Sequence, residues 1–509
     1  MRDGFKKNVV TVGGLTAVSR ILGFIRDMVM AWLLGAGPLA DAFVVANRIP
    51  NLLRRFMAEG AVSVAFVPVF SEVKEREGIE KAYIMAQEIM TLMFYGLVAV
   101  VIIGEIIAPA LVAIMAPGFI HSSVFAVTVH LTRIMFPYIL LIGVAVLFMG
   151  ILNSIGHFAA PAAAPILMNL FMISVPLLCF VVFPVFTSPA DSFAWGVIIG
   201  GIAQIIIQIP PLLKRRVPLR PTLTFHSSRV KQVIRLLGVA AIGASIYQIN
   251  VLIGTLFASL LSEGSVSYLY YANRLLELPL GIFAFAVGNV MLPAMSSASA
   301  RMDSEQFSFL MGRGLTAVLL FTIPATIGAC VLARPIFTIL FMRGAFSFND
   351  ALESAYALQM YGVSLWAVGY TRIQTQALYA MQKAKAVVNI SWMSLVVNIV
   401  FCIILMPFLQ HAGIALASSI SVFAQLLIQH KYLRKEGIYI PKEYIRHFGK
   451  MVASSLIMGV VLVPLGRMYL WRTGLTVKSG ALLLLCVSLG GSLYFGLLWA
   501  MGMRGFGKK

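Results

Sequence analysis

Arginines and carboxylates interrupt several long apolar runs of this sequence, and these residues could do chemistry. The first run contains Arg20, Arg26 and Asp27, and a later run contains Arg274 and Glu277. Further charged residues within such runs or at their ends are Asp41, Arg48, Arg54, Arg55, Glu59, Glu105, Arg133 and Arg372. Guanidinium groups bind phosphate and carboxylate through paired hydrogen bonds. The pattern therefore predicts recognition of an anion.

Acids are too few to neutralise these arginines inside the runs. The internal pairings open to them are Asp27 with Arg20 or Arg26, Glu59 with Arg55, and Glu277 with Arg274. Eight arginines then face four acids that lie inside the runs, so ion pairing leaves a cationic excess. The four acids are Asp27, Glu59, Glu105 and Glu277. We expect that excess to line a water-filled cavity that accepts an anion.

Composition indicates that the apolar runs cross a membrane. The 509 residues are 60% hydrophobic and 11% charged, whereas soluble domains have about 25% charged residues. Because about 20 apolar residues cross a bilayer, we predict an all-α polytopic membrane protein with fourteen transmembrane helices. They cover roughly residues 8–36, 41–71, 84–116, 123–152, 160–184, 193–213, 232–260, 266–298, 309–340, 351–380, 386–408, 411–430, 446–469 and 479–502.

The loops between these spans alternate in charge. One set of loops, with both termini, holds 26 of the 39 Lys and Arg residues. The opposite loops hold only Arg343, Arg467, Arg472 and Lys478, with Arg334 near them at a span end. The positive-inside rule then places both termini in the cytoplasm. Membrane orientation explains the net charge of +20, and we expect no nucleic-acid partner.

Motifs of catalysis and metal binding do not occur in the sequence. It has no GxSxG motif, no P-loop and no HExxH motif. Its four cysteines lie inside apolar runs, where they are expected to be small buried hydrophobes. They are Cys179, Cys330, Cys402 and Cys486. We predict a transporter without catalytic residues, cofactor or bound metal.

The arginines of the first spans are costly in lipid. Each arginine at the bilayer centre costs about 2.5–3.5 kcal/mol on insertion scales. Arg20 lies about 18 Å from Asn8 along a helix, near the middle of a bilayer. These side chains must therefore face protein or water. On a helical wheel Arg20, Gly23 and Asp27 share a face, and Arg26 lies to one side of it.

Several sequence marks recur 226 residues apart, which indicates an internal repeat of six spans. The matches are Ala46-Asn47-Arg48 with Ala272-Asn273-Arg274, Pro109 with Pro335, Gly118 with Gly344, and Leu152 with Leu378. An even number of spans gives both copies one orientation, as in transporters whose halves rock around a central site. We predict an N-lobe over 1–230, a C-lobe over 231–440, and two additional helices over 441–509.

Motifs in spans one, two and eight carry a resemblance to a known family. They are Ser19-Arg20-Ile-Leu-Gly-Phe-Ile-Arg26-Asp27, Asp41-Ala-Phe, Pro50-Asn51-Leu-Leu-Arg54-Arg55-Phe-Met-Ala-Glu59-Gly60-Ala, and Gly264-Ser-Val-Ser-Tyr-Leu-Tyr-Tyr-Ala-Asn273-Arg274-Leu-Leu-Glu277-Leu-Pro279. With them, the sequence strongly resembles the MurJ (MviN) lipid II flippases of bacterial peptidoglycan synthesis, from about residue 8 to the last span.

The resemblance implies the fold of the multidrug/oligosaccharidyl-lipid/polysaccharide exporter superfamily. Two six-span lobes would enclose a cationic cavity, and the last two spans would form a groove for the polyprenyl tail. It implies the inner membrane as location, lipid II and membrane lipids as ligands, and cell-wall synthesis enzymes as partners. By motif position, the residues that match arginines required for function in that family are Arg20, Arg26, Arg54 and Arg274. Our other substrate-binding candidates are Ser19, Asp27, Arg48, Asn51, Arg55, Glu59, Asn273 and Glu277.

Departures from the family concern cation coupling. Some relatives have an acid where this chain has Asn273, and some bind sodium through acids in spans seven and eleven. Here 232–260 and 386–408 contain no Asp or Glu, and Asn250 and Asn398 are the neutral candidates for those positions. The energy source is left open between membrane potential and a monovalent cation.

The predicted function is the flipping of lipid II from the cytoplasmic to the outer leaflet by alternating access. The cavity would bind its diphosphate and sugar-peptide head. The alternative is export of another polyprenyl-linked glycan or anionic lipid by the same fold. A cation-coupled drug exporter fits a positive cavity poorly. A non-transporting scaffold for cell-wall enzymes would tolerate neutral residues in place of the arginines.

Overall fold

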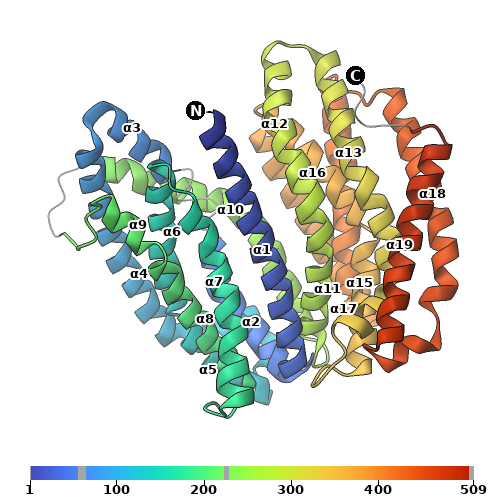
Figure 1. Ribbon diagram of the computed structural model, residues 1–509, viewed down its shortest axis with the longest axis horizontal. Coiled ribbons are helices and arrows are strands. Elements are labelled where there is room, and N and C mark those ends of the chain that lie inside the picture. Colours follow the sequence, from blue (N-terminus) through green and yellow to red (C-terminus); the bar gives the residue numbers. More distant parts are fainter. Residues whose placement is uncertain (1, 56–64, 223–228, 504–509) are drawn as a thin grey trace. The chain divides into compact units, whose positions relative to one another are not determined.

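The computed structural model describes residues 2–55, 65–222 and 229–503, and every regular element in these ranges is a helix (Figure 1). The helices form two compact units, Met1–Glu263 and Gly264–Lys509. The all-helical class predicted from composition is therefore confirmed. The lobe boundaries near residues 230 and 440 stay a prediction.

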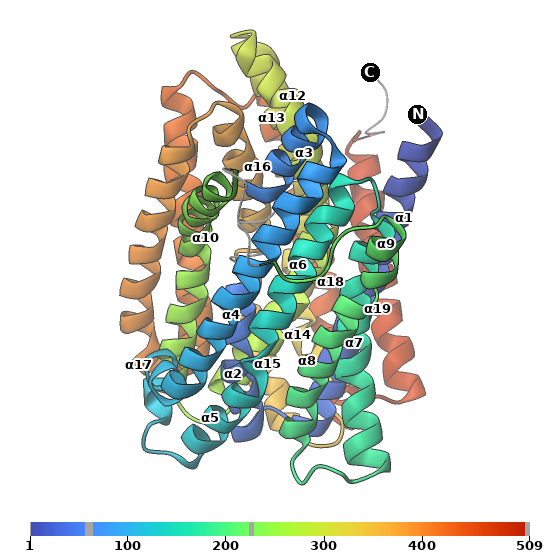
Figure 2. The ribbon, with the colours of Figure 1, turned by 90° about the vertical axis from the view of Figure 1, so that its left-hand side faces the viewer.

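The first unit is a bundle of long helices joined by short connections (Figure 2). Its elements are α1 (Arg2–Leu34), α2 (Pro38–Arg55), α3 (Val67–Glu77), α4 (Ile79–Met115), η2 (Pro117–Phe119), α5 (Ser123–Met135), α6 (Tyr138–Ser154), α7 (Ala159–Pro176), η3 (Leu177–Val182), α8 (Pro189–Ile206), α9 (Ile209–Lys214) and α10 (Arg229–Ser259). Gly35 follows α1 with a φ of 67°, a left-handed conformation that glycine adopts without strain. Ser188 caps α8 by accepting a hydrogen bond from the Ala190 N–H.

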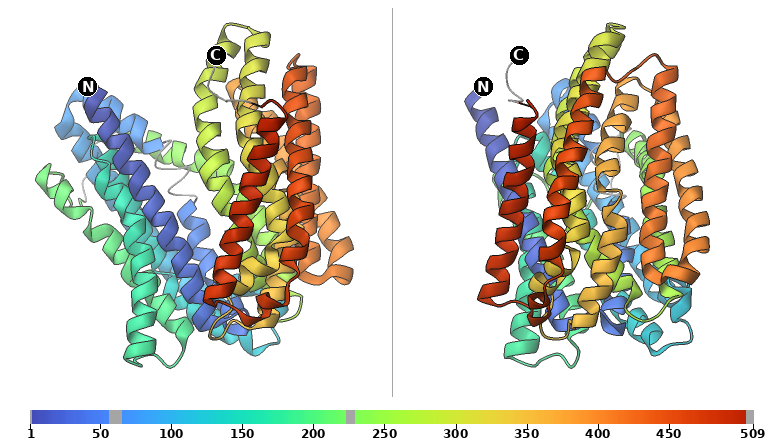
Figure 3. Two further views of the ribbon diagram at one scale, coloured as in Figure 1. Left: turned by 45° about the vertical axis from the view of Figure 1, so that its right-hand side comes forward. Right: turned by 90° about the vertical axis from the view of Figure 1, so that its right-hand side faces the viewer.

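The second unit has the same construction and ends in two neighbouring helices, α18 and α19 (Figure 3). Its elements are α11 (Ser265–Pro279), η4 (Leu280–Ala284), α12 (Phe285–Ala300), α13 (Ser304–Val331), α14 (Ala333–Leu340), α15 (Phe348–Gly362), α16 (Leu365–Ala380), α17 (Ala384–Lys435), α18 (Lys442–Gly466), η5 (Tyr469–Thr473) and α19 (Val477–Ala500). Capping boxes at Ser347 and Thr476 begin α15 and α19.

Helix α17 is two helices joined by a sharp turn. Gln410, inside it, has a φ of 51° and a ψ of −135°, which are not helical angles. A straight helix of 52 residues would be about 78 Å long. Yet Lys383 before it and Glu436 after it form an ion pair of 3.1 Å, and this hydrogen bond raises the pKa of Lys383. The chain therefore turns back at Gln410, between predicted spans 386–408 and 411–430.

Eight helical segments of the described chain are long and apolar enough to cross a membrane. They include Ile79–Met115, Ser304–Val331 and α17, which holds two of the predicted spans. The helices of predicted spans one, two and eight are not among them. Those helices carry the charged residues singled out above, and charge lowers their hydropathy. The described chain therefore contains helices that are able to cross a membrane, whereas the total of fourteen is taken up below as a proposal.

Helix starts in the two units recur at nearly the offset of the sequence marks. Helix α4 begins at Ile79 and α13 at Ser304, 225 residues later. Helix α6 begins at Tyr138 and α16 at Leu365, 227 residues later. The repeated residues thus occupy equivalent places in the order of helices.

Helix α13 lies in the buried core of the second unit. Its Phe307, Met311 and Leu319 pack in one apolar cluster with Trp471 and Tyr494. Tight contacts bring α18 against α13, since a Cβ at Gly466 would lie 2.7 Å from the Val331 carbonyl oxygen. The additional helices are therefore integral to this unit.

Candidate functional site

A polar network in the first unit connects α1 with α7. The Arg26 guanidinium forms an ion pair of 2.7 Å with Asp27, whose residue is only 2% exposed. Its Nη1 donates to Asn169 Oδ1 at 3.0 Å. The Asn169 amide in turn donates to the Ser19 carbonyl oxygen at 2.9 Å and contacts the Ser19 hydroxyl at 3.4 Å. Two predicted site residues, Arg26 and Ser19, thus contact one amide that the sequence analysis did not select, and Asp27 joins the network through Arg26.

The face of α1 that meets α7 differs from the face drawn on the helical wheel. Ser19, Gly23 and Arg26 form one stripe, and a Cβ at Gly23 would lie 3.5 Å from Asn169. A stripe through Arg20, Gly23 and Asp27 has equivalent spacing. Both stripes contain Gly23, so periodicity alone could not decide between them. The contacts with α7 do, and they place Arg20 off this interface.

Arg20 is exposed, unlike Arg26 and Asp27. Within the part of the chain that the structure describes, it has no ion-pair or hydrogen-bond partner. This cation of α1 is thus available to an external anion. This position fits the predicted role of Arg20 in binding substrate.

Helix α2 presents two of the predicted residues. Asn51 Nδ2 donates to the Asn47 carbonyl oxygen at 2.8 Å and lies 2.9 Å from its side-chain oxygen. Arg48 Nη1 lies 3.5 Å from the Val251 carbonyl oxygen on α10. The side chains of Arg54 and Arg55, and the whole of Glu59, lie outside the described residues.

In the second unit, α11 holds the counterpart cluster. Arg274 Nη1 lies 2.8 Å from Glu277 Oε2, and its guanidinium carbon lies 5.0 Å from the ring centroid of Tyr270. Asn273 is exposed and donates to Glu277 at 3.2 Å. The arrangement presents a half-exposed guanidinium, held by an acid and a ring, on a membrane helix.

Internal ion pairing therefore holds for two of the three pairs considered from sequence. Arg26 is paired with Asp27, and Arg274 with Glu277. The third pair lies outside the described residues. Pairing does not extend to Arg20, and a neutralised pair can still donate its other N–H groups to a phosphate. The structure thus supports a mixed role, with internal ion pairs that also orient donors.

Other charged residues of the membrane helices have local partners. Arg133 is exposed and its Nε donates to the Glu105 carbonyl oxygen at 3.4 Å. Glu88 in α4 is fully buried, an acid that the count of four in the apolar runs omitted. These residues bear on helix packing and are not brought to the α1–α7 network by any described contact.

Of the two neutral candidates for a cation site, Asn398 is engaged in hydrogen bonds with a hydroxyl and a thiol. Asn398 Nδ2 donates to Ser418 Oγ at 3.1 Å, and the Cys402 thiol donates to Asn398 Oδ1 at 3.5 Å. No group of three or more His, Cys, Asp or Glu side chains suited to a metal occurs in the searched residues. All four cysteines are free.

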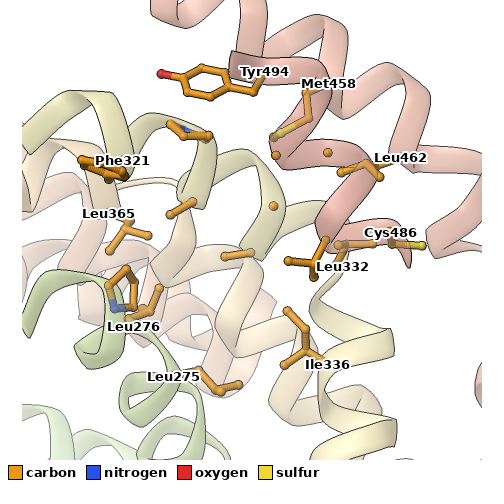
Figure 4. A pocket seen from close by; sticks show the side chains of 18 of the residues that line it. Leu275, Leu276, Phe321, Leu332, Ile336, Leu365, Met458, Leu462, Cys486 and Tyr494 are labelled. Atoms are coloured by element: carbon orange, nitrogen blue, oxygen red, sulfur yellow. The ribbon is translucent and has the colours of Figure 1, made fainter. Parts of the chain in front are cut away.

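An apolar cavity of about 340 Å³ lies within the second unit, a size typical of ligand pockets. Figure 4 shows Leu276, Phe321, Leu332 and Met458 around it. The lining comes from α11, α13, α14, α15, α16, α18 and α19. The hydroxyl of Tyr494 donates to the Leu320 carbonyl oxygen at 2.9 Å. The cavity thus suits a hydrocarbon chain.

Solved transporters share this arrangement of helices. An inward-facing multidrug resistance MATE family transporter of the MOP superfamily superposes with a TM-score of 0.69 over 84% of this chain and 97% of that chain. Its sequence identity of 12% establishes a common fold and nothing about substrate. The chain therefore has the fold of that superfamily.

Sequence comparisons are more specific. The family described as lipid II flippase MurJ matches residues 30–482. The lipid II flippase MurJ of Burkholderia cenocepacia is 34% identical over 506 residues, 97% of each chain. The probable lipid II flippase MurJ of Vibrio cholerae is 33% identical over 98% of this chain and 96% of its own. A solved lipid II flippase MurJ in an inward closed conformation has a TM-score of 0.80 at 26% identity, covering 96% of this chain and 98% of its own.

The chain therefore belongs to the lipid II flippase MurJ family. It is a multipass transporter of the bacterial inner membrane rather than an enzyme.

Sequence reasoning missed Asn169 and the apolar cavity. An amide in the apolar stretch Ile166-Leu-Met-Asn169-Leu-Phe-Met172 was a signal, because a buried amide needs hydrogen-bond partners. The cavity left no such signal, because its lining residues resemble any other apolar residues of a membrane helix.

Proposed function

We propose that this chain flips lipid II from the cytoplasmic to the outer leaflet by alternating access. Lipid II flipping is the activity for which its family is named. The observation that carries the mechanism is an exposed Arg20, which has no partner among the described residues, next to the Arg26–Asp27–Asn169 network of the same helix. In this proposal guanidinium groups of α1 and α2 donate to the diphosphate, and Arg274 of α11 is a further candidate donor.

The topology that we propose has fourteen transmembrane helices with both termini in the cytoplasm. Helices occur at every predicted span, and α17 supplies two because it turns back at Gln410. The Lys383–Glu436 ion pair joins the two ends of α17, which supports a position on one side of the membrane, and the loop charges favour the cytoplasmic side. Labelling of single cysteines at Arg2 and Arg467 tests this topology. The first should react only from the cytoplasm and the second only from outside.

Lipid II also needs a site for its polyprenyl tail, and we propose the apolar cavity beside α18 and α19. A side chain at Gly491 would enter open space in the cavity lining. We expect Gly491→Leu to reduce flipping several-fold by filling that space, without unfolding the chain. Gly496→Leu is the matched control, because Gly496 lies on the same helix in open space but is not a lining residue. Equal activity of both variants would exclude the cavity as the tail site.

Asn169 is expected to support activity by orienting Arg26. Loss of a buried hydrogen-bond partner costs about 1–3 kcal/mol, so Asn169→Ala should lower the flipping rate about tenfold. Asn153→Ala is the control, since this asparagine makes no side-chain hydrogen bond in the described chain. Both are measured as lipid II flipping in proteoliposomes. An Asn169→Ala variant with normal flipping and unchanged thermal unfolding contradicts the role.

Membrane potential is the energy source that we propose. A negative charge moving outward from a negative interior gains about 2.3 kcal/mol per 100 mV. Two charges on a diphosphate would gain about 5 kcal/mol at the same potential. The neutral hydrogen bonds of Asn398 favour this source over sodium. An ionophore that collapses the potential should slow flipping, and exchange of sodium for potassium should not. A strict sodium requirement would reverse the assignment.

The deciding experiment is complementation of a bacterium depleted of its own flippase, with lipid II exposure on the outer leaflet as readout. We expect the chain to restore both growth and exposure. Well-inserted protein that restores neither would mean that another lipid-linked substrate is carried. Export of such a substrate is the less favoured function, because the family and the full-length relatives are lipid II flippases.

A further inference from the structure

Two arginines share one aromatic ring in the second unit. The guanidinium carbon of Arg334 lies 5.3 Å from the ring centroid of Phe348, and that of Arg472 lies 5.8 Å from the same centroid. Arg334 belongs to α14, Phe348 begins α15, and Arg472 lies in η5 between α18 and α19. Arg472 is thus more than 120 residues away in sequence from the ring that it shares with Arg334. Figure 3 shows the α18–α19 connection at one end of the unit.

No acid of the described residues forms an ion pair with either cation. Neither guanidinium lies within 4.0 Å of a carboxylate among the residues that the structure describes. The nearby Asp350 instead accepts hydrogen bonds from the Tyr268 hydroxyl and the Ser347 N–H. The ring attracts each cation only weakly. An anion that binds the two guanidinium groups would neutralise their charge.

One hydrogen-bond donor of Arg334 is also unused within the described chain. The Arg334 Nε is buried and has no hydrogen-bond partner within the described chain. Arg343, by contrast, donates to the carbonyl oxygens of Ile339 and Leu340 and so caps α14. An arginine can thus be purely structural at this end of the unit, and Arg334 lacks the corresponding bonds. Its unused Nε–H suits a phosphate oxygen.

The surroundings of Arg472 are those of a membrane surface. Tyr469, Leu475 and Val477 are 74%, 57% and 91% exposed, and Arg472 lies 5.2 Å from the Tyr469 ring centroid. Exposed apolar side chains next to arginine and tyrosine are typical of the boundary between hydrocarbon and head groups. An anion that reaches this pair is therefore best supplied by a lipid.

The apolar cavity lies on the other side of α14. Leu332 and Ile336, four residues apart, line the cavity, whereas Arg334 between them contacts Phe348. An α-helix with its side chains is about 10–12 Å wide. A lipid chain in the cavity would therefore carry its phosphate to within about one helix width of the arginines.

We infer that Arg334 and Arg472 form a binding site for the phosphate group of a lipid, separate from the arginines of α1, α2 and α11. On the topology of the proposed function, on which this placement rests, the site faces the outer leaflet. The chemistry is that of a phosphate or diphosphate oxygen held by two guanidinium groups. A resident phospholipid and a free diphosphate are the two sources that share it.

Native mass spectrometry of the full chain tests the site. The protein is released from nanodiscs of phosphatidylglycerol and phosphatidylcholine, and the bound phosphatidylglycerol molecules are counted. We expect the Arg334→Gln/Arg472→Gln variant to retain one fewer, with affinity at that site lowered at least about tenfold. Arg467→Gln is the matched control, because Arg467 is exposed at the same end and contacts no ring or acid in the described chain. It should retain the full number.

A second arm separates the two sources. Inorganic diphosphate is added to lipid-free protein, and the thermal unfolding temperature is measured. A rise in wild type that is lost in the double variant, without any difference in bound phosphatidylglycerol, assigns the site to a free anion. Equal lipid counts and equal diphosphate responses overturn the site. The Arg20→Ala variant separates this test from the proposed function, since it should lose flipping and keep the phosphatidylglycerol.

Discussion

Replacing Arg20 by alanine is expected to abolish lipid II flipping while the chain stays folded and inserted. Arg20 is exposed and makes no ion pair or hydrogen bond within the described residues, so its removal breaks no internal contact. A hydrogen bond from a guanidinium to a charged oxygen contributes about 1.5–3 kcal/mol. One such bond corresponds to a loss of about tenfold to a hundredfold, and a diphosphate can accept two. Outer-leaflet lipid II in a flippase-depleted bacterium is the readout.

Two further variants make the Arg20 result specific. Arg76→Ala removes an exposed arginine of the same unit that already pairs with Glu72 at 3.2 Å, and it should keep full activity. Arg20→Lys keeps the charge but loses the planar fork of donors, so it should retain only part. Normal growth with Arg20→Ala as the only flippase would refute the cationic site.

Helix positions were predictable because apolar stretches and charged loops alternate along this chain. Breaks inside the helices were less so. Predicted span 123–152 is in fact α5 and α6, separated at Phe136 and Pro137, where proline lacks an N–H for the helix ladder. Conversely, the turn at Gln410 was expected, because the predicted spans 386–408 and 411–430 meet there. The residues on both sides of Gln410 are helical.

Charged pairs were predictable where both partners lie on one helix. Arg26 with Asp27 and Arg274 with Glu277 are one and three residues apart, distances that a helix brings together. The contact of Arg26 with Asn169 joins residues 143 positions apart, so the periodicity of a single helix could not predict it. Which face of α1 meets α7 likewise depends on tertiary packing.

Arg274→Ala is expected to abolish flipping, and simultaneous replacement of Glu277 should not restore it. The Arg274–Glu277 pair is 2.8 Å apart, with side chains 31% and 40% exposed, so both groups can also reach an external ligand. If Arg274 only neutralised Glu277, its loss would leave an unpaired carboxylate, and removing that carboxylate would recover activity. If Arg274 binds the diphosphate, the cation itself is required.

A double-mutant cycle separates these two roles. Flipping rates and thermal unfolding are measured for Arg274→Ala, Glu277→Ala and the double variant. We expect Glu277→Ala to remain active, because the guanidinium is retained, and the double variant to be as inactive as Arg274→Ala. Recovery of flipping in the double variant would show that Arg274 serves the ion pair alone. The substrate cations would then have to be sought among the arginines of the first unit, where Arg20 has no acid partner within the described residues.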